Sequence, residues 1–160
     1  TVTSGTRLLS LVREINNGMP AHTVQLTRRA LNQAGIEMSE ANVLVLGVTY
    51  RGDIKDTLNS PSITIIQCLN DQCKQVYAFD PLLLDEVENW NANVVKDLSE
   101  VGKDVPIDAI IVASDHSMFK EMDWSDLARR VRQRIVVDGR LCLDRQSMTE
   151  AGWVVFGIGS

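Results

Sequence analysis

The aromatic and cationic residues Tyr50 and Arg51 are the first side chains in the sequence that are suited to bind a ligand. They follow the apolar run 43–47. Such a pair suits a base or sugar stacked near a phosphate, because the ring offers a flat face and the guanidinium a fixed positive charge. A long polar surface loop over 47–60 explains the same residues equally well, so this segment alone leaves both interpretations open.

Arg140 is a second candidate, at the end of the apolar run 134–138. It follows Asp138 and Gly139, and the glycine permits a tight turn there. The arginine would then donate a planar fork of hydrogen bonds to a phosphate or to sugar hydroxyls. The alternative is a surface ion pair between Asp138 and Arg140, which would contribute little energy. We favour ligand binding for Arg140.

Asp80 and His116 also end apolar runs, but other interpretations suit them better. A single histidine at a strand end is more often a hydrogen-bonded structural residue than a general base. An acid at the position of Asp80 binds ribose in dinucleotide-binding folds, but 47–60 lacks the G-x-G-x-x-G pattern on which that role depends. We interpret Asp80 as a turn residue. The sequence presents no Ser-His-Asp set, Cys-His pair or carboxylate dyad, so we expect no reaction centre in this chain.

The composition narrows the possible classes of protein. A chain of 160 residues with 44% hydrophobic and 23% charged residues suits one soluble domain. We expect no membrane span and no signal peptide, because the longest apolar runs have the length of strands. A net charge of −5 argues against nucleic acid, and we interpret the basic cluster 129–134 as a cationic helix end.

Cysteine and histidine are too few and too scattered to indicate a metal site. Cys68, Cys73 and Cys142 are odd in number and lack the spacing of metal ligands, and the chain has only two histidines. These features indicate buried or incidental thiols in a reducing compartment.

The elements that must position these residues follow an α/β pattern. Apolar, β-branched runs alternate with helical or irregular stretches and occur at 43–47, 75–79, 92–95, 108–113, 134–138 and 153–157. Continuous hydrophobicity is typical of parallel strands buried on both faces, and the alternation implies right-handed crossovers. We expect a Rossmann-like, doubly wound, mainly parallel sheet. Ligands bind such sheets beyond the carboxyl ends of the strands, where Tyr50, Arg51 and Arg140 are expected.

Two helices are expected before the first strand. An amphipathic helix is predicted over 4–16, a break at 16–20 (NNGMP), and a second helix from about 21 to 34 that ends near Gly35. After the first strand, Ser60 is expected to be the N-cap of a further helix, because a proline follows it at the first helical position.

Four segments, in this order and spacing, resemble the C-terminal domain of the nucleotide-sugar 6-dehydrogenases, which act on UDP-glucose, UDP-N-acetylmannosamine or GDP-mannose: LGVTYRGDIKDTLNSPS, VYAFDP, ASDHSMF and VVDGR. In addition, 13–24 (REINNGMPAHTV) is similar to the end of the family's long central helix, which carries the dimer contact. The resemblance implies that 1–40 are the end of that helix and a connecting helix. It also implies that 41–160 form a Rossmann-like UDP-sugar-binding domain.

The same resemblance implies an NAD-dependent enzyme that oxidises the sugar C6 alcohol to a carboxylate in two hydride transfers, through a cysteine nucleophile. The family binds NAD mainly through an N-terminal domain whose glycine motif is not found here, and no cysteine of this chain matches the nucleophile motif. The chain is therefore expected to hold a UDP-sugar and to be inactive alone. A cytoplasmic homodimer or higher homo-oligomer, with a role in polysaccharide biosynthesis, is implied as well.

Residue by residue, Tyr50 and Arg51 match the family's pair that contacts the UDP-sugar, and Arg140 matches its substrate-binding arginine. Leu58 stands where the family has an arginine that reaches the cofactor, so no cofactor-binding residue is expected here. Within the family, the chain is most similar to the UDP-N-acetylmannosamine branch. The features that indicate this are Arg51 in place of lysine, His116 and the N-x-x-M-P segment. A UDP-glucose 6-dehydrogenase domain and a non-catalytic nucleotide-binding or regulatory module remain alternatives.

Overall fold

The structure is a computed structural model that describes residues 4–58, 60–84 and 91–157, with the backbone alone for 4–17. Its centre is a six-stranded parallel sheet in the order β3-β2-β1-β4-β5-β6. The strands are β1 Asn42–Leu46, β2 Gln75–Phe79, β3 Asn93–Val94, β4 Ala109–Val112, β5 Ile135–Asp138 and β6 Val154–Gly157. Each corresponds to one of the predicted runs, so the expected doubly wound parallel sheet is confirmed.

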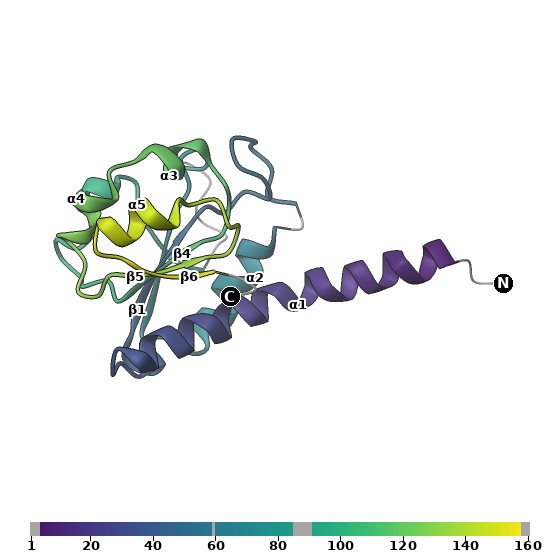
Figure 1. The fold of residues 1–160 in the computed structure, drawn as a ribbon, viewed down its shortest axis with the longest axis horizontal. Coiled ribbons are helices and arrows are strands. Elements are labelled where there is room, and N and C mark those ends of the chain that lie inside the picture. The colour runs from purple at the N-terminus through teal and green to yellow at the C-terminus, as the bar shows by residue number, and fades with distance from the viewer. Residues whose placement is uncertain (1–3, 59, 85–90, 158–160) are drawn as a thin grey trace.

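Helices cover both faces of the sheet (Figure 1). One core cluster joins Val43 and Val45 of β1 to α1 (Ser4–Gln33) and to α2 (Pro61–Asn70). The other joins Leu44 and Leu46 to the short helices α3 (Ser117–Glu121), α4 (Trp124–Ala128) and α5 (Arg145–Glu150). Successive strand residues point to opposite faces, so a strand buried on both faces needs the unbroken apolar run seen in the sequence.

The sharp turn into α2 forms as predicted. Ser60 is the N-cap, its Oγ accepts a hydrogen bond from the Ser62 N–H at 3.3 Å, and Pro61 is the first helical residue. Two short 3-10 helices, η1 (Met38–Glu40) and η3 (Leu98–Glu100), complete the connections in the described residues. Because β1 and α2 are both anchored in the core, the segment between them is held at both ends.

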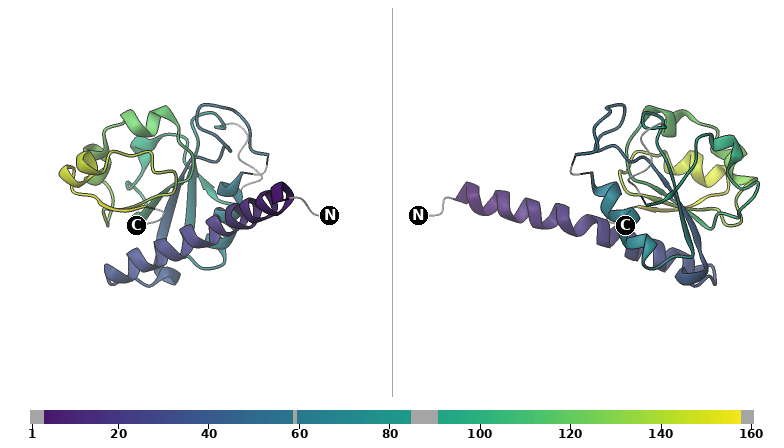
Figure 2. Two further views of the ribbon diagram at one scale, coloured as in Figure 1. Left: turned by 45° about the vertical axis from the view of Figure 1, so that its right-hand side comes forward. Right: turned by 180° about the vertical axis from the view of Figure 1, so that it is seen from behind.

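The predicted break at 16–20 is wrong: α1 (Ser4–Gln33) is one helix that continues through Pro20. Proline inside a helix removes one hydrogen bond and its ring crowds the preceding turn, but its fixed φ is compatible with a helix, and α1 continues through it. Val24 and Leu31 on the second half of α1 pack against the sheet. The first half projects away from the body of the protein (Figures 1 and 2). The side chains of the predicted apolar stripe over 4–16 lie outside the described residues.

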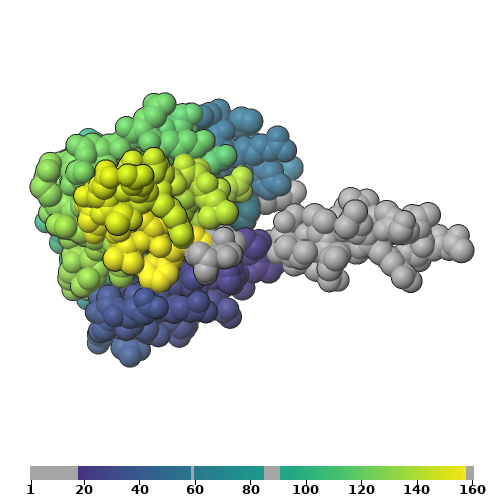
Figure 3. Space-filling view, in the orientation of Figure 1, coloured from purple at the N-terminus to yellow at the C-terminus, as the bar shows by residue number. Residues whose placement is uncertain are grey.

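In the space-filling view, the part of α1 from Gly18 onward runs along one side of the rounded body (Figure 3). No helix among the described residues combines the length and apolarity that crossing a bilayer requires.

The basic cluster 129–134 lies before β5, and three of its arginines contact acidic side chains. Arg129 is the C-cap of α4, as a cationic helix end requires, and both Arg129 and Arg130 contact Asp126. Arg132 forms a two-pronged ion pair with the buried Asp108, with distances of 2.5 and 2.7 Å. The cluster thus stabilises local structure.

Candidate functional site

The loop between β1 and α2 begins where β1 approaches the end of β4. Gly47 has φ +94°, and a Cβ there would lie 2.5 Å from the Cβ of Ser114. A Cβ on Gly52 would overlap the backbone carbonyl of Asp115. Both glycines are therefore required by the close approach of two chain segments, and neither serves as the close-approach glycine of a pyrophosphate loop.

Asp80, at the end of β2, holds the start of this loop. Its buried carboxylate accepts hydrogen bonds from the N–H groups of Val48 (2.7 Å), Thr49 (3.0 Å) and Leu82 (2.9 Å). Burial by itself raises the pKa of Asp80, but the hydrogen bonds from His116 and from these amides outweigh it and lower the pKa. The carboxylate is therefore a structural anion, as the turn interpretation requires, and is not placed to bind a ribose.

His116 is fully buried beside Asp80. Its Nε2 lies 3.0 Å from Oδ2 of Asp80 and 2.9 Å from Oγ1 of Thr49, and its Nδ1 accepts the Asp53 N–H at 2.9 Å. The ring also packs edge-to-face on Phe119, with a centroid distance of 5.3 Å. Every polar atom of the ring has a protein partner, which fits the structural interpretation and leaves no nitrogen for general-base chemistry.

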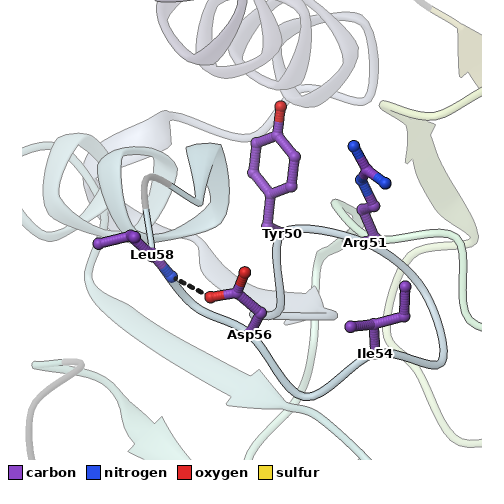
Figure 4. Close-up of a pocket in the computed structure, with 5 residues that line it drawn as sticks. All are labelled: Tyr50, Arg51, Ile54, Asp56 and Leu58. Carbon is purple, nitrogen blue, oxygen red and sulfur yellow. Dashed lines mark hydrogen bonds between the residues drawn. The ribbon is translucent and has the colours of Figure 1, made fainter.

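Tyr50 and Arg51 line a hollow of about 330 Å³ together with Ile54, Asp56 and Leu58. The two side chains extend side by side from the loop (Figure 4), and the guanidinium carbon of Arg51 is 5.7 Å from the centre of the Tyr50 ring. This distance permits a cation–π contact. The polar surface loop therefore presents a stacked aromatic–cation pair at the carboxyl edge of the sheet.

A short internal framework shapes this hollow. The N–H of Tyr50 donates to the carbonyl of Asp56 at 2.6 Å, and the carboxylate of Asp56 accepts the N–H of Leu58 at 2.9 Å. Leu58 is 74% exposed. The residue that replaces the expected cofactor-reaching arginine thus forms an apolar part of the rim.

Arg140 lies at the same edge of the sheet. Its ionic partner is not Asp138, the residue considered as an alternative in the sequence. The Asp138 carboxylate accepts the backbone N–H groups of Arg140 (3.2 Å), Cys142 (3.3 Å) and Leu143 (2.9 Å), which fixes the turn after β5. The guanidinium of Arg140 lies instead 3.9 Å from the carboxylate of Asp115. A surface pair between Asp138 and Arg140 is therefore contradicted.

Asp115 connects the two candidate binding segments, a role that the sequence did not indicate. Its Oδ1 accepts the N–H of Gly52 at 2.8 Å and is also the atom nearest to Arg140. The hydrogen bond from Gly52 is the largest cause of the lowered pKa of Asp115, and the charge of Arg140 adds to it. The signal in the sequence was the pair Asp115-His116 at the end of a strand that neighbours β1 in the sheet.

Asp53, an acidic residue of the same loop, has a contact that the sequence did not indicate. It has φ +62°, and its carboxylate accepts hydrogen bonds from the N–H and the hydroxyl of Ser117. These bonds, the hydroxyl's first, lower the pKa of Asp53. Asp53 thereby joins the loop between β1 and α2 (residues 47–60, the β1 loop) to the start of α3.

Cys73 and Cys142 are poorly suited to nucleophilic catalysis. Burial raises the pKa of Cys73 to about 11 and that of Cys142 to about 12, so both are protonated at neutral pH. A thiol reacts as a nucleophile in its thiolate form. In the described part of the chain, no three His, Cys, Asp or Glu side chains are gathered in a way that could hold a metal ion.

The β1 loop also fits NAD poorly. The N–H groups of Val48 and Thr49 donate to Asp80, so they are not free for a pyrophosphate, and the carboxylate of Asp80 is committed to those amides. Tyr50, Arg51 and Arg140 are exposed, as are residues 53–58 of the β1 loop. The ring and the two guanidinium groups suit a ligand with a flat ring and a phosphate charge.

Comparison with known proteins identifies relatives whose sequences align with nearly the whole chain. A UDP-N-acetyl-D-mannosamine dehydrogenase of Pyrococcus horikoshii is 32% identical over 95% of this chain and 33% of its own length. A UDP-glucose 6-dehydrogenase of Rickettsia conorii is 29% identical over 96% of this chain and 35% of its own length. The chain thus spans about a third of the length of these curated relatives.

Solved structures agree with these relatives. The UDP-N-acetyl-D-mannosamine dehydrogenase structure from Pyrococcus horikoshii has a TM-score of 0.77 at 31% identity, over 93% of this chain and 32% of that one. An NDP-N-acetyl-D-galactosaminuronic acid dehydrogenase from Methanosarcina mazei has a TM-score of 0.81 at 28% identity, over 94% and 31%. Residues 44–145 match the UDP-binding domain of the UDP-glucose/GDP-mannose dehydrogenase family, and the chain belongs to this family.

Proposed function

We propose that this chain binds the nucleotide-diphosphate part of a UDP-sugar within a UDP-N-acetyl-D-mannosamine 6-dehydrogenase. The observation that carries the proposal is the placement of the Tyr50–Arg51 pair and Arg140 at one edge of the sheet, joined through Asp115. Membership of the family supports the choice of a UDP-linked ligand.

Each of the three residues has a distinct role in this proposal. Tyr50, which is 39% exposed, offers a ring face for the base or a sugar. Arg51 and Arg140 supply positive charge and planar donors for the diphosphate. Arg140 is already beside a carboxylate, so ligand binding exchanges part of that contact for stronger contacts with phosphate oxygens.

The proposed reaction of the whole enzyme is the NAD-dependent oxidation of the sugar C6 alcohol to a carboxylate in two steps. In it, this chain holds and orients the substrate and supplies no catalytic residue. Two features support inactivity of the chain alone: the raised pKa values of Cys73 and Cys142, and the poor fit of the β1 loop to NAD. Leu58 offers no charge or hydrogen bond to a cofactor.

Two alternatives differ from this proposal, one in the hexose that is oxidised and the other in the absence of any catalysis. A UDP-glucose 6-dehydrogenase has support from the relative of that name at 29% identity. A non-catalytic nucleotide-binding module has support from Leu58. NADH formation by the full-length protein with each UDP-sugar distinguishes the three, since the module would oxidise neither sugar.

Titration calorimetry of the 160-residue chain with UDP and with NAD tests the binding function. We expect UDP to bind and NAD not to bind. Loss of a charge-assisted hydrogen bond costs about 1.5–3 kcal/mol, so Arg51→Ala and Arg140→Ala should each weaken UDP binding at least about tenfold. Arg129→Ala is the matched control, because Arg129 pairs with Asp126 before β5. An unsubstituted chain that binds no UDP contradicts the proposal.

We also propose that 1–40 contain the end of a dimer-forming central helix, that 41–160 are the UDP-sugar-binding domain, and that the enzyme works in the cytoplasm. The projecting first half of α1 supports the dimer (Figure 2). The three free cysteines support a reducing compartment. Light scattering should give a dimer or larger assembly. A strictly monomeric chain with α1 fully helical would contradict the proposed contact.

A further inference from the structure

The dipeptide Asp115-His116 contacts the β1 loop immediately after Arg51. The carboxylate of Asp115 accepts the Gly52 N–H at 2.8 Å, and Nδ1 of His116 accepts the Asp53 N–H at 2.9 Å. Two successive side chains from the end of β4 thus bind two successive amides of the loop. This pairing fixes the backbone on the C-terminal side of Arg51.

The other nitrogen of His116 fixes the backbone on the N-terminal side. Because Nδ1 is an acceptor, the neutral ring carries its hydrogen on Nε2, which faces Asp80 Oδ2 at 3.0 Å and Thr49 Oγ1 at 2.9 Å. The hydroxyl of Thr49 in turn lies 2.9 Å from the carbonyl of Arg51, to which it donates. One buried ring therefore holds the segment from Thr49 to Asp53 at both ends.

Asp115 extends this framework to the second binding segment. The same Oδ1 that accepts the Gly52 N–H lies 3.9 Å from Nη2 of Arg140. A side chain at position 52 would overlap the Asp115 backbone, so the loop after β1 is in close contact with the segment after β4. Asp115 thus links the backbone next to Arg51 to the guanidinium of Arg140.

We propose that Asp115 and His116 are positioning residues for nucleotide-diphosphate binding, which hold Arg51 and Arg140 at the separation that the ligand requires. This inference rests on the proposed function and adds to it the two residues that preorganise the site. His116 has no exposed surface, so it acts through the loop and not by touching the ligand. Fixing both cations before the ligand arrives reduces the ordering cost of binding.

Variants of Asp115 give the cleaner test, because its side chain is 40% exposed and its replacement leaves the core intact. Asp115→Ala removes the acceptor of the Gly52 N–H, and we expect UDP binding by the 160-residue chain to weaken at least tenfold. Asp115→Asn keeps an acceptor oxygen, and we expect affinity within threefold of the unsubstituted chain. The exposed Asp104 provides the control Asp104→Ala, which should bind UDP unchanged.

Variants of His116 separate the contribution of the Nδ1 contact from that of the Nε2 contacts. His116→Asn places an amide oxygen near the position of Nδ1 and keeps an acceptor for the Asp53 N–H, whereas His116→Leu removes both polar contacts. We expect UDP binding to weaken at least tenfold in His116→Leu and to be partly restored in His116→Asn. Protected amides in β1 serve as the check that each variant is folded.

Hydrogen exchange without ligand supplies the second readout. Exchange at Gly52 should accelerate at least tenfold in Asp115→Ala, and exchange at Asp53 should do so in His116→Leu. Unchanged exchange in these variants contradicts the positioning role, whatever the chain binds. Faster exchange with unchanged UDP affinity contradicts it too, since the contacts would then be local only. Failure of the unsubstituted chain to bind UDP contradicts the proposed function instead.

Discussion

The Oδ2 atom of Asp80 lies 3.0 Å from Nε2 of His116, and both side chains are fully buried at the carboxyl edge of the sheet. The same carboxylate oxygen accepts two amides from the start of the β1 loop. The N–H groups of Val48 and Thr49, at the place where a dinucleotide-binding fold contacts its ligand, are therefore hydrogen-bonded to Asp80 instead. The candidate site lies further out, at Tyr50, Arg51 and Arg140, on a loop that this buried pair supports.

Replacement of Asp80 should destabilise the fold. Asp80→Asn removes the negative charge that two loop amides and His116 face, and a lost hydrogen-bond partner in the interior costs about 1–3 kcal/mol. We expect the free energy of unfolding, measured in urea, to fall by an amount in this range. The exposed Asp104 provides the control Asp104→Asn, which should change it by less than about 0.5 kcal/mol. Equal stability of the two variants would contradict the structural role.

Stability should fall in acid because several carboxyl groups have lowered pKa values in the folded protein. The lowered pKa values of Asp80 and Asp115 mean that these groups add stability above the unfolded pKa, which is near 4. That contribution is lost as the pH falls through the lower, folded pKa values. Urea unfolding should therefore show a decline in stability below about pH 4, less steep in Asp80→Asn.

Two glycines should respond in opposite directions to the same substitution. Gly52→Ala forces a methyl group into the backbone of Asp115, and overpacking of this kind costs about 1–3 kcal/mol. Gly18 lies in α1, and beyond its own helix backbone no described atom lies within 4 Å of the place that an added methyl group would take, so Gly18→Ala should stabilise the chain by about 0.5–1 kcal/mol. Melting temperatures of the two variants provide the measurement, and a stable Gly52→Ala would disprove the close approach.

The two thiols with raised pKa values should resist alkylation in the native state. Burial raises the pKa of Cys73 to about 11 and that of Cys142 to about 12, which leaves little thiolate at pH 8. We expect iodoacetamide to label both at least about 100-fold more slowly in buffer than in denaturing urea. Peptide mass spectrometry gives the rate at each cysteine, and rapid native labelling at either would show a reactive thiolate there.

The strands could be predicted from the sequence because burial on both faces requires an unbroken apolar run. The six runs correspond to the six strands of the sheet, and Ser60-Pro61 begins α2 as its capping chemistry requires. The continuity of α1 could not be predicted. A proline inside a helix removes one hydrogen bond and crowds the preceding turn, at a cost of about 3 kcal/mol. The packing of Val24 and Leu31 on the sheet offsets this cost.

By itself, the sequence determined the parallel α/β fold, the family and the candidate ligand residues Tyr50, Arg51 and Arg140, because these follow from local patterns and ordered motifs. The tertiary structure alone decided what Asp80, Asp115 and His116 do. Apart from Leu82 beside Asp80, their hydrogen-bond partners lie 31 to 67 residues away along the chain, and Arg140, the ionic partner of Asp115, follows the neighbouring strand β5. A buried carboxylate or imidazole takes its role from the groups around it, and only folding brings those groups together.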